Sequence, residues 1–152
     1  MGNIFNQDFH DFIQVLNDHN VEYILVGGYS VIVYGHSRTT GDLDIWVNRT
    51  KDNYEKISKA FTSFGMGVFE MTEENFLFHP EWDVFRFGRA PVAIDIMIKV
   101  KGLEFENSFK SSVIKEVEGL SVRILNYDNL ITSKRSAGRN KDIDDINSLE
   151  KK

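Results

Sequence analysis

The chain has 152 residues, of which 41% are hydrophobic and 27% charged, and it carries a formal net charge of −5. This length predicts a single domain over residues 1–152, and the acidic balance argues weakly against a broad nucleic-acid-binding face. The sequence has no cysteine, which excludes disulfides and thiolate metal sites, and it shows neither a signal peptide nor an apolar stretch of membrane-spanning length, so we expect a cytoplasmic protein.

Apolar residues recur at helical and strand spacings along the whole chain. The first half predicts, in order, a helix at 6–20 with Asn6 as its N-cap, a strand at 22–26, a helix at 29–34, a strand at 42–47 and a helix at 51–64. The second half predicts strands at 76–78, 84–87 and 92–98, a hairpin that joins 113–117 to 120–125, a helix capped by Asn126 and a last helix at 142–149. This mixture indicates one α/β (α+β) domain.

Asp42 and Asp44 alternate with Leu43 and Ile45 on the strand expected at 42–47. Residues i and i+2 of a strand point to the same face, so the two carboxylates project together. Side by side they repel each other, and a divalent cation such as Mg²⁺, which takes oxygen ligands, relieves this repulsion. Alternating acids are also common on a solvent-facing strand, so the pair alone leaves both interpretations open.

Asp95 interrupts the most apolar strand of the chain, where Ile94 and Ile96 flank it. An unpaired carboxylate in such a place costs several kcal/mol. Asp95 therefore either faces a metal site or pairs with a basic side chain such as Arg86 or Lys99.

Gly27 and Gly28 stand where the strand expected at 22–26 meets the following helix. Glycine lets a backbone approach a ligand closely, and the free N–H groups of a helix N-terminus can bind a phosphate. A simple tight turn is the alternative interpretation of the same two residues.

The order of these motifs resembles the signature of the DNA polymerase β-like nucleotidyltransferase superfamily. Val26-Gly27-Gly28 is followed by a helix, by the segment 35–41 and then by Asp42-Leu43-Asp44. Asp95 stands where that superfamily has its third carboxylate, on a strand downstream. The segment 127–149 is similar to a helical segment of the nucleotidyltransferase toxins and of enzymes that modify small molecules.

The resemblance implies a mixed central sheet flanked by helices. It also implies a small bacterial nucleotidyltransferase that binds ATP and depends on Mg²⁺. Such an enzyme transfers a nucleoside monophosphate from a nucleoside triphosphate to a hydroxyl of a small molecule, a tRNA or a protein, and pyrophosphate leaves. By similarity, two Mg²⁺ ions, or Mn²⁺ as the alternative, are bound by Asp42, Asp44 and Asp95, with Asp95 completing the ion that activates the acceptor.

The resemblance also assigns nucleotide binding to Gly27, Gly28, Ser30, Arg38, Thr40, Lys134 and Arg139. Gly28 is a departure, because many members of the superfamily have serine there. For Lys134 and Arg139, a solvated basic helix face is the alternative interpretation.

Two further possibilities concern partners. A homodimer or an antitoxin-like partner could complete the site of so short a chain. The alternative function is a non-catalytic nucleotide- or partner-binding module of a toxin–antitoxin-like system.

Overall fold

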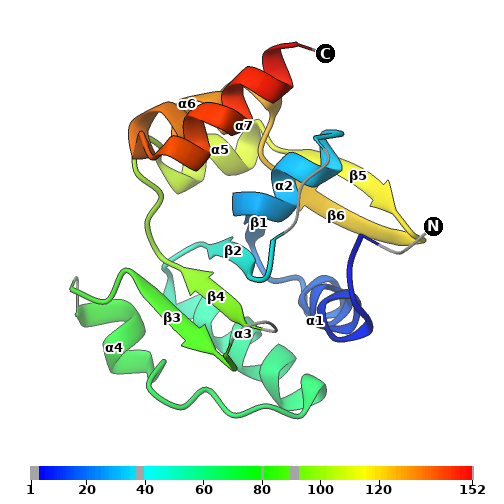
Figure 1. Ribbon diagram of the computed structural model, residues 1–152. Helices are drawn as coiled ribbons and strands as arrows, with labels where there is room; N and C mark the ends of the chain where they lie inside the picture. The colour runs from blue at the N-terminus through cyan, green and yellow to red at the C-terminus, as the bar shows by residue number, and fades with distance from the viewer. Residues whose placement is uncertain (1–3, 37–39, 80, 90–92, 152) are drawn as a thin grey trace.

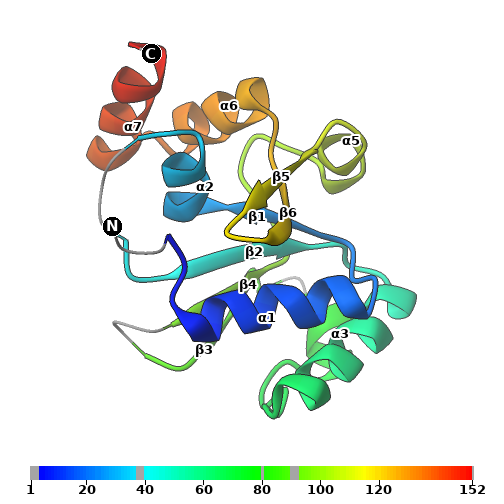
Figure 2. The same ribbon diagram turned by 90° about the vertical axis from the view of Figure 1, so that its right-hand side faces the viewer.

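The computed structural model describes residues 4–36, 40–79, 81–89 and 93–151. Within these ranges, helices cover both faces of one mixed β-sheet (Figures 1 and 2). The strands are β1 (Tyr23–Val26), β2 (Leu43–Val47), β3 (Val84–Phe87), β4 (Ile94–Met97), β5 (Val113–Val117) and β6 (Leu120–Ile124). The helices are α1 (Gln7–Asp18), α2 (Gly27–Val33), α3 (Lys51–Phe64), α4 (Glu73–Phe78), α5 (Phe105–Lys110), α6 (Tyr127–Ala137) and α7 (Asn140–Glu150).

The six strands lie in the order β3-β4-β2-β1-β6-β5. The β1–β2, β3–β4 and β5–β6 pairs are antiparallel, whereas β1–β6 and β2–β4 are parallel. This mixed sheet flanked by helices confirms the predicted fold class. In the part of the chain that the structure describes, no helix combines the length and the apolar character of a membrane span.

Two hydrophobic cores lie on the two faces of the sheet. On one face, α1 and α3 pack aromatic side chains such as Phe12 and Phe61, whose ring centroids are 5.6 Å apart, against the sheet. On the other face, Trp46 of β2 packs with Leu130 of α6 and Ile146 of α7. Because side chains alternate along a strand, Asp44 shares the second face with Trp46. The carboxylate face is therefore the face that α6 and α7 cover.

Most predicted elements are confirmed, but two regions differ from the prediction. The strand expected at 76–78 is wrong, because these residues end helix α4, which begins after Thr72. The Thr72 hydroxyl caps this helix by accepting a hydrogen bond from the Asn75 backbone N–H, and two glutamates in the first turn suit the helix dipole. Helix α5 was not predicted at all.

Candidate active site

The strand register places one residue from each of four neighbouring strands in a single row across the sheet. Arg86 of β3 is aligned with Asp95 of β4, Asp95 with Asp44 of β2, and Asp44 with Val26 of β1. Aligned residues of neighbouring strands point to the same face. Asp42, two residues before Asp44, lies beside this row. The three aspartates named by the sequence are thus neighbours on one face of the sheet.

Arg86 bridges two of these aspartates. Its Nη2 atom lies 3.0 Å from Asp95 Oδ2 and 3.0 Å from Asp42 Oδ2, while its own side chain is 49% exposed. Of the two partners left open for Asp95, the structure thus selects Arg86, and Lys99 pairs with Asp83 instead. The two carboxylates raise the pKa of the Arg86 guanidinium, so this bridge stays charged.

Asp95 is only partly neutralised by Arg86. Its second oxygen, Oδ1, is buried, and within the described residues no N–H or hydroxyl group donates a hydrogen bond to it. Burial raises the pKa of the Asp95 carboxyl above its ordinary value, although the Arg86 charge opposes this shift. A buried oxygen without a donor is a position that a cation or a hydroxyl group can occupy.

Asp44 is the most strongly perturbed carboxyl of the row. Burial, together with the negative charges of Asp95 and Asp42, raises its pKa to about 7. A protonated Asp44 can donate a hydrogen bond to Asp95, and the positive charge of Lys134 opposes the shift only in part. Near neutral pH, the row therefore carries more acid than its own cations neutralise.

Gly27 allows Asp44 to take this position. The glycine has a φ of +72°, and a Cβ atom added to it would lie 2.1 Å from Asp44 Oδ2. The glycine predicted to approach a ligand therefore approaches the central carboxylate as well. The neighbouring Ser30 is fully buried, and its hydroxyl donates a 2.6 Å hydrogen bond to the Gly27 carbonyl oxygen, which braces the turn. Gly28 is also buried, inside helix α2.

Lys134 belongs to a buried ion network between α6 and α7. Its Nζ atom lies 3.4 Å from Asp142 Oδ1 and 3.2 Å from Asp145 Oδ2, and the whole residue is 6% exposed. Arg139 joins the network through a 2.6 Å hydrogen bond from Nε to Asp142 Oδ2. Burial alone would raise the pKa of Asp142, but Arg139 and Lys134 hold it below its ordinary value. The interpretation of Lys134 as part of a solvated helix face is therefore wrong.

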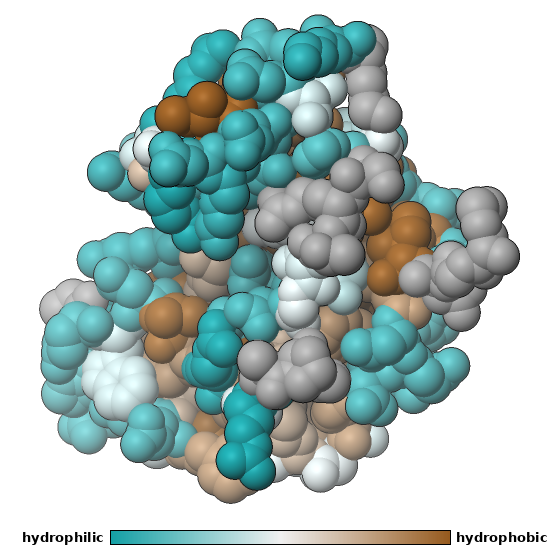
Figure 3. Space-filling model, viewed as in Figure 1, coloured by the Kyte–Doolittle hydropathy of each residue, from teal (hydrophilic) through white to brown (hydrophobic). Residues whose placement is uncertain are grey.

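A cavity of about 220 Å³ separates the carboxylate row from this ion network. Gly27 and Asp44 lie on one side of it, and Lys134 and Arg139 on the other. In Figure 3, a hollow on the left separates the upper part of the molecule, formed by α5, α6 and α7, from the lower part with β3 and α4. The structure thus brings four of the predicted residues to one cleft: Gly27, Asp44, Lys134 and Arg139.

Two lysines that the sequence did not assign to nucleotide binding also line this cleft. Lys99 and Lys101 follow β4 directly, in the loop that leads toward α5. Gly102, with a φ of +89°, lets this loop approach α6 so closely that a Cβ atom would lie 2.2 Å from Ser136 Oγ. Basic residues directly after the strand that carries Asp95 were the signal in the sequence. Of the other predicted residues, Thr40 is half-buried just before Asp42, and Arg38 lies outside the described residues.

The carboxylate row fits a divalent metal in its chemistry but is not preassembled for one. In the described ranges, no group of three or more Asp, Glu and His side chains is already arranged to hold a metal ion. In this structure, Arg86 bonds both Asp42 and Asp95. The donors are nevertheless carboxylate oxygens, one of them buried without a partner, which is the ligand type that Mg²⁺ takes.

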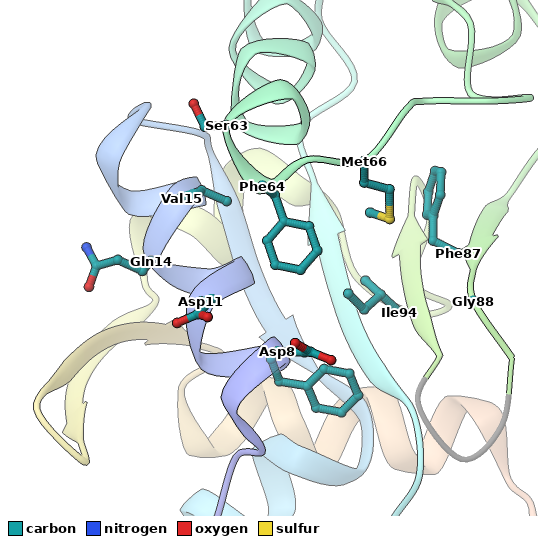
Figure 4. A pocket seen from close by; sticks show the side chains of 11 residues that line it. Asp8, Asp11, Gln14, Val15, Ser63, Phe64, Met66, Phe87, Gly88 and Ile94 are labelled. Carbon is teal, nitrogen blue, oxygen red and sulfur yellow. The ribbon is translucent and has the colours of Figure 1, made fainter.

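A larger cavity, of about 600 Å³, lies away from this chemistry (Figure 4). It is lined by Phe64 and Met66 at the end of α3, by Asp8 and Asp11 of α1, and by Phe87 of β3. These elements pack on the sheet face opposite to Asp44 and Asp95. Size alone therefore does not identify the active site of this fold.

A glycine turn beside carboxylates on neighbouring strands of a mixed sheet is the arrangement that the resemblance to nucleotidyltransferases implies. Over residues 7–150, the chain matches the family described as "Nucleotidyltransferase of unknown function (DUF6036)", and it belongs to this family. No curated protein matches the chain.

Solved structures of nucleotidyltransferases share the fold. The lincosamide antibiotic adenylyltransferase LnuA, solved with lincomycin bound, superposes with a TM-score of 0.64 at 14% identity, covering 98% of each chain. The antibiotic-resistance factor ANT(2'')-Ia gives 0.63 at 12% identity, covering 93% of this chain and 80% of its own. A putative nucleotidyltransferase from Thermotoga maritima, TM1012, gives 0.59 at 13% identity, covering 95% and 91%. These structures confirm the fold that the resemblance implied, and the family match confirms a nucleotidyltransferase.

Proposed function

We propose that the protein transfers a nucleoside monophosphate from a Mg²⁺-bound nucleoside triphosphate, in the first place ATP, to a hydroxyl of a small molecule, with release of pyrophosphate. The observation that carries this proposal is the alignment of Asp44 with Asp95 across β2 and β4, beside a basic cleft. The acceptor assignment draws on the neighbours, since LnuA is described as an adenylyltransferase and was solved with a small molecule bound.

In this proposal, Asp42, Asp44 and Asp95 hold the metal. When bound, Mg²⁺ would neutralise charge on the phosphates and polarise the reacting oxygens. Asp95 Oδ1, which is buried without a partner, is placed to accept a hydrogen bond from the attacking hydroxyl. The carboxylates of the sheet would thus hold the metal and orient the acceptor, and the bound metal would offset the repulsion between these carboxylates and an incoming phosphate.

The phosphates are assigned to the opposite side of the cleft. Lys99, Lys101 and Arg139 line the cavity. Lys99 and Arg139 pair with Asp83 and Asp142, but their side chains stay more than half exposed, so their charges can still offset those of a triphosphate. Lys134 lies in the same wall but is engaged with Asp142 and Asp145, so we assign it to shaping this wall and not to a direct phosphate contact. Gly27 and Gly28 have no Cβ atom, so the nucleotide can lie close to the backbone of the turn.

Residues 1–152 are taken to act as one nucleotidyltransferase domain, because a single sheet connects the described elements. The alternative function is a nucleotide- or partner-binding module that does not catalyse transfer. It predicts nucleotide binding without any transfer. The perturbed Asp44 carboxyl favours the enzyme, since structures concentrate such strained acids at sites of chemistry.

The test is calorimetric titration with each of the four ribonucleoside triphosphates in the presence of Mg²⁺. We expect one of them to bind and a chelator of Mg²⁺ to abolish the binding. Asp44→Asn should lose the binding, whereas Asp52→Asn, a matched change at an exposed aspartate on α3, should keep it. Equal binding by both variants, or binding that ignores the chelator, would rule out this metal site.

A further inference from the structure

The loop that follows β4 connects the carboxylate row with the opposite side of the cleft. Lys99 comes four residues after Asp95 of β4, so their Cα atoms are at most about 14 Å apart. Lys99 and Lys101 line the cleft, and in Figure 1 the segment that carries them rises on the left, from β4 toward α5 and α6. We call residues 99–102 the lysine loop.

The lysine loop is anchored on both sides of Lys101. Val100 and Leu103 are half-buried and pack against the core that contains Leu130 of α6. The Leu103 backbone N–H also donates a 3.2 Å hydrogen bond to the Val100 carbonyl oxygen, which closes a turn around Lys101 and Gly102. Lys101 is therefore presented to the cleft from a fixed turn, although its own side chain is exposed.

Gly102 determines how closely this turn approaches α6. Its φ is +89°, and a Cβ atom added to it would lie 2.2 Å from Ser136 Oγ and 2.9 Å from Ser136 Cβ. Real Cβ atoms essentially never come within 3.0 Å of such neighbours, so any other residue at this position would push the turn and α6 apart. The glycine thus sets the distance between Lys101 and α6, which forms the adjoining wall of the cleft.

Lys101 differs from the other cations of the cleft because its charge is unmatched. Each of the other three forms an ion pair with an aspartate: Lys99 at 3.7 Å, Lys134 at 3.4 Å and Arg139 at 2.6 Å. In the ranges that the structure describes, Lys101 forms neither an ion pair nor a hydrogen bond. A lysine that only solubilises a surface needs no anchored turn. An anion that enters the cleft would give this held charge its partner.

The place of Lys101 in the cleft indicates which part of a nucleotide it meets. Asp44 and Lys101 line the same cleft. In the proposed function, the reacting phosphate lies at the carboxylate row, so the phosphates beyond it extend from the row into the cleft. A lysine ammonium is a compact charge with three donors, which suits the oxygens of such a phosphate. A nucleoside monophosphate has only the reacting phosphate and leaves this cation without a partner.

We propose that Lys101 binds the terminal phosphate of the donor nucleotide and that Gly102, through the contact of its turn with Ser136, positions Lys101 for this task. The lysine loop thereby selects nucleoside triphosphates over monophosphates. This inference rests on the proposed function for the identity of the ligand. It adds to that function the residue that distinguishes nucleotides by their number of phosphates.

Calorimetry with ATP and AMP in the presence of Mg²⁺, or with the corresponding pair for whichever base binds, tests the role of Lys101. The two nucleotides share the nucleoside and the first phosphate. Lys101→Gln should weaken ATP binding about three- to tenfold and leave AMP binding unchanged. Lys59→Gln, which removes an exposed lysine of α3 on the other face of the sheet, is the control and should change neither.

Gly102→Ala tests the positioning, and Gly65→Ala is its matched control. Gly65 has a φ of +88°, and no atom of the described residues lies within 4 Å of its Cβ position, so both variants carry the same backbone strain and only Gly102→Ala meets Ser136. Gly102→Ala should weaken ATP binding about three- to tenfold without changing AMP binding, whereas Gly65→Ala should change neither. Adding Ser136→Gly to Gly102→Ala removes the clashing atoms and should restore most of the ATP affinity. Urea denaturation verifies that each variant is folded.

The outcomes separate this inference from the proposed function. The inference is overturned if Lys101→Gln and Lys59→Gln bind ATP equally, or if Gly102→Ala weakens ATP and AMP binding alike and Ser136→Gly does not rescue it. In either case, ATP binding that still requires Mg²⁺ and Asp44 leaves the proposed function standing. A wild-type chain that binds no nucleotide would overturn both.

Discussion

Two charged clusters face each other across the cleft, and they differ in how completely their charges are balanced. Between α6 and α7, the carboxylates Asp142 and Asp145 are matched by Lys134 and Arg139. On the sheet, Arg86 is half exposed and bonds two of the three carboxylates, Asp42 and Asp95.

The pKa values of the buried aspartates in the two clusters shift in opposite directions. Asp142 is buried, yet its cations lower the pKa of its carboxyl, whereas the pKa of the buried Asp44 is raised to about 7. Buried charge with matched partners holds two helices together. In the function proposed here, the carboxylates without matched partners receive a divalent cation together with the nucleotide. The comparison teaches that charge balance, more than the number of acids, separates structure from function here.

The largest effect is expected from a substitution that disrupts the ion network between α6 and α7. Lys134→Ala removes the cation between Asp142 and Asp145 and leaves both carboxylates buried without it, so the free energy of unfolding should fall by about 3–5 kcal/mol. Urea denaturation measures this. Arg135→Ala is the control, since the exposed Arg135 pairs only loosely with Glu150 at 3.6 Å and should change stability by less than about 1 kcal/mol. Equal losses in the two variants would contradict the buried network.

The next largest effect is expected from a substitution that removes a buried charge from the carboxylate row. The pKa of Asp44 is raised in the folded chain, so its contribution to stability is complete below the unfolded pKa of about 4 and is lost as the pH rises toward 7. Without metal, Asp44→Asn should therefore stabilise the fold by about 1–3 kcal/mol near pH 8, and this gain should shrink near pH 4.5. Denaturation at both pH values measures the gain. A variant that is less stable than wild type at the higher pH would show that Asp44 is not strained.

The smallest effect is expected from a substitution that removes the positive charge of Arg86 from the row. Arg86 occupies the space between Asp42 and Asp95 that a metal would share, so Arg86→Gln should increase Mg²⁺ affinity about three- to tenfold. Lys56→Gln is the control, because Lys56 pairs with the exposed Asp52 on α3, away from the carboxylate row. Calorimetry measures both affinities. Weaker metal binding by Arg86→Gln would mean that the guanidinium supports the metal site and does not compete for it.

The sequence predicts the elements best where periodicity is long. The helix expected at 51–64 is observed with these bounds as α3, because an amphipathic pattern repeats over several turns. At 76–78, three apolar residues were too few to distinguish a strand from the last turn of α4. The cap at Thr72 carried the information that the short apolar run lacked. Local chemistry can therefore outweigh a weak pattern.

The sequence predicted residues of the candidate site, but it did not predict which of them are aligned or paired with one another. Alternation along one strand places Asp42 and Asp44 together, but the alignment of Asp44 with Asp95 depends on the pairing of β2 with β4, which no local pattern contains. In the same way, the burial of Lys134 depends on partners supplied by α7. The resemblance to a known superfamily supplied the long-range part, and it did not extend to Arg86 or to the lysines after β4.

The central claim is that the carboxylate row binds a divalent metal through Asp44, and titration with Mn²⁺ in nucleotide-free protein tests it most directly. Calorimetry near pH 6 and pH 8, in two buffers with different ionisation heats, measures both the affinity and the protons released. The account predicts tighter binding at the higher pH, release of up to about one proton near pH 7, and loss of both effects in Asp44→Asn. Affinity that is independent of pH, without proton release and unchanged in Asp44→Asn, would contradict it.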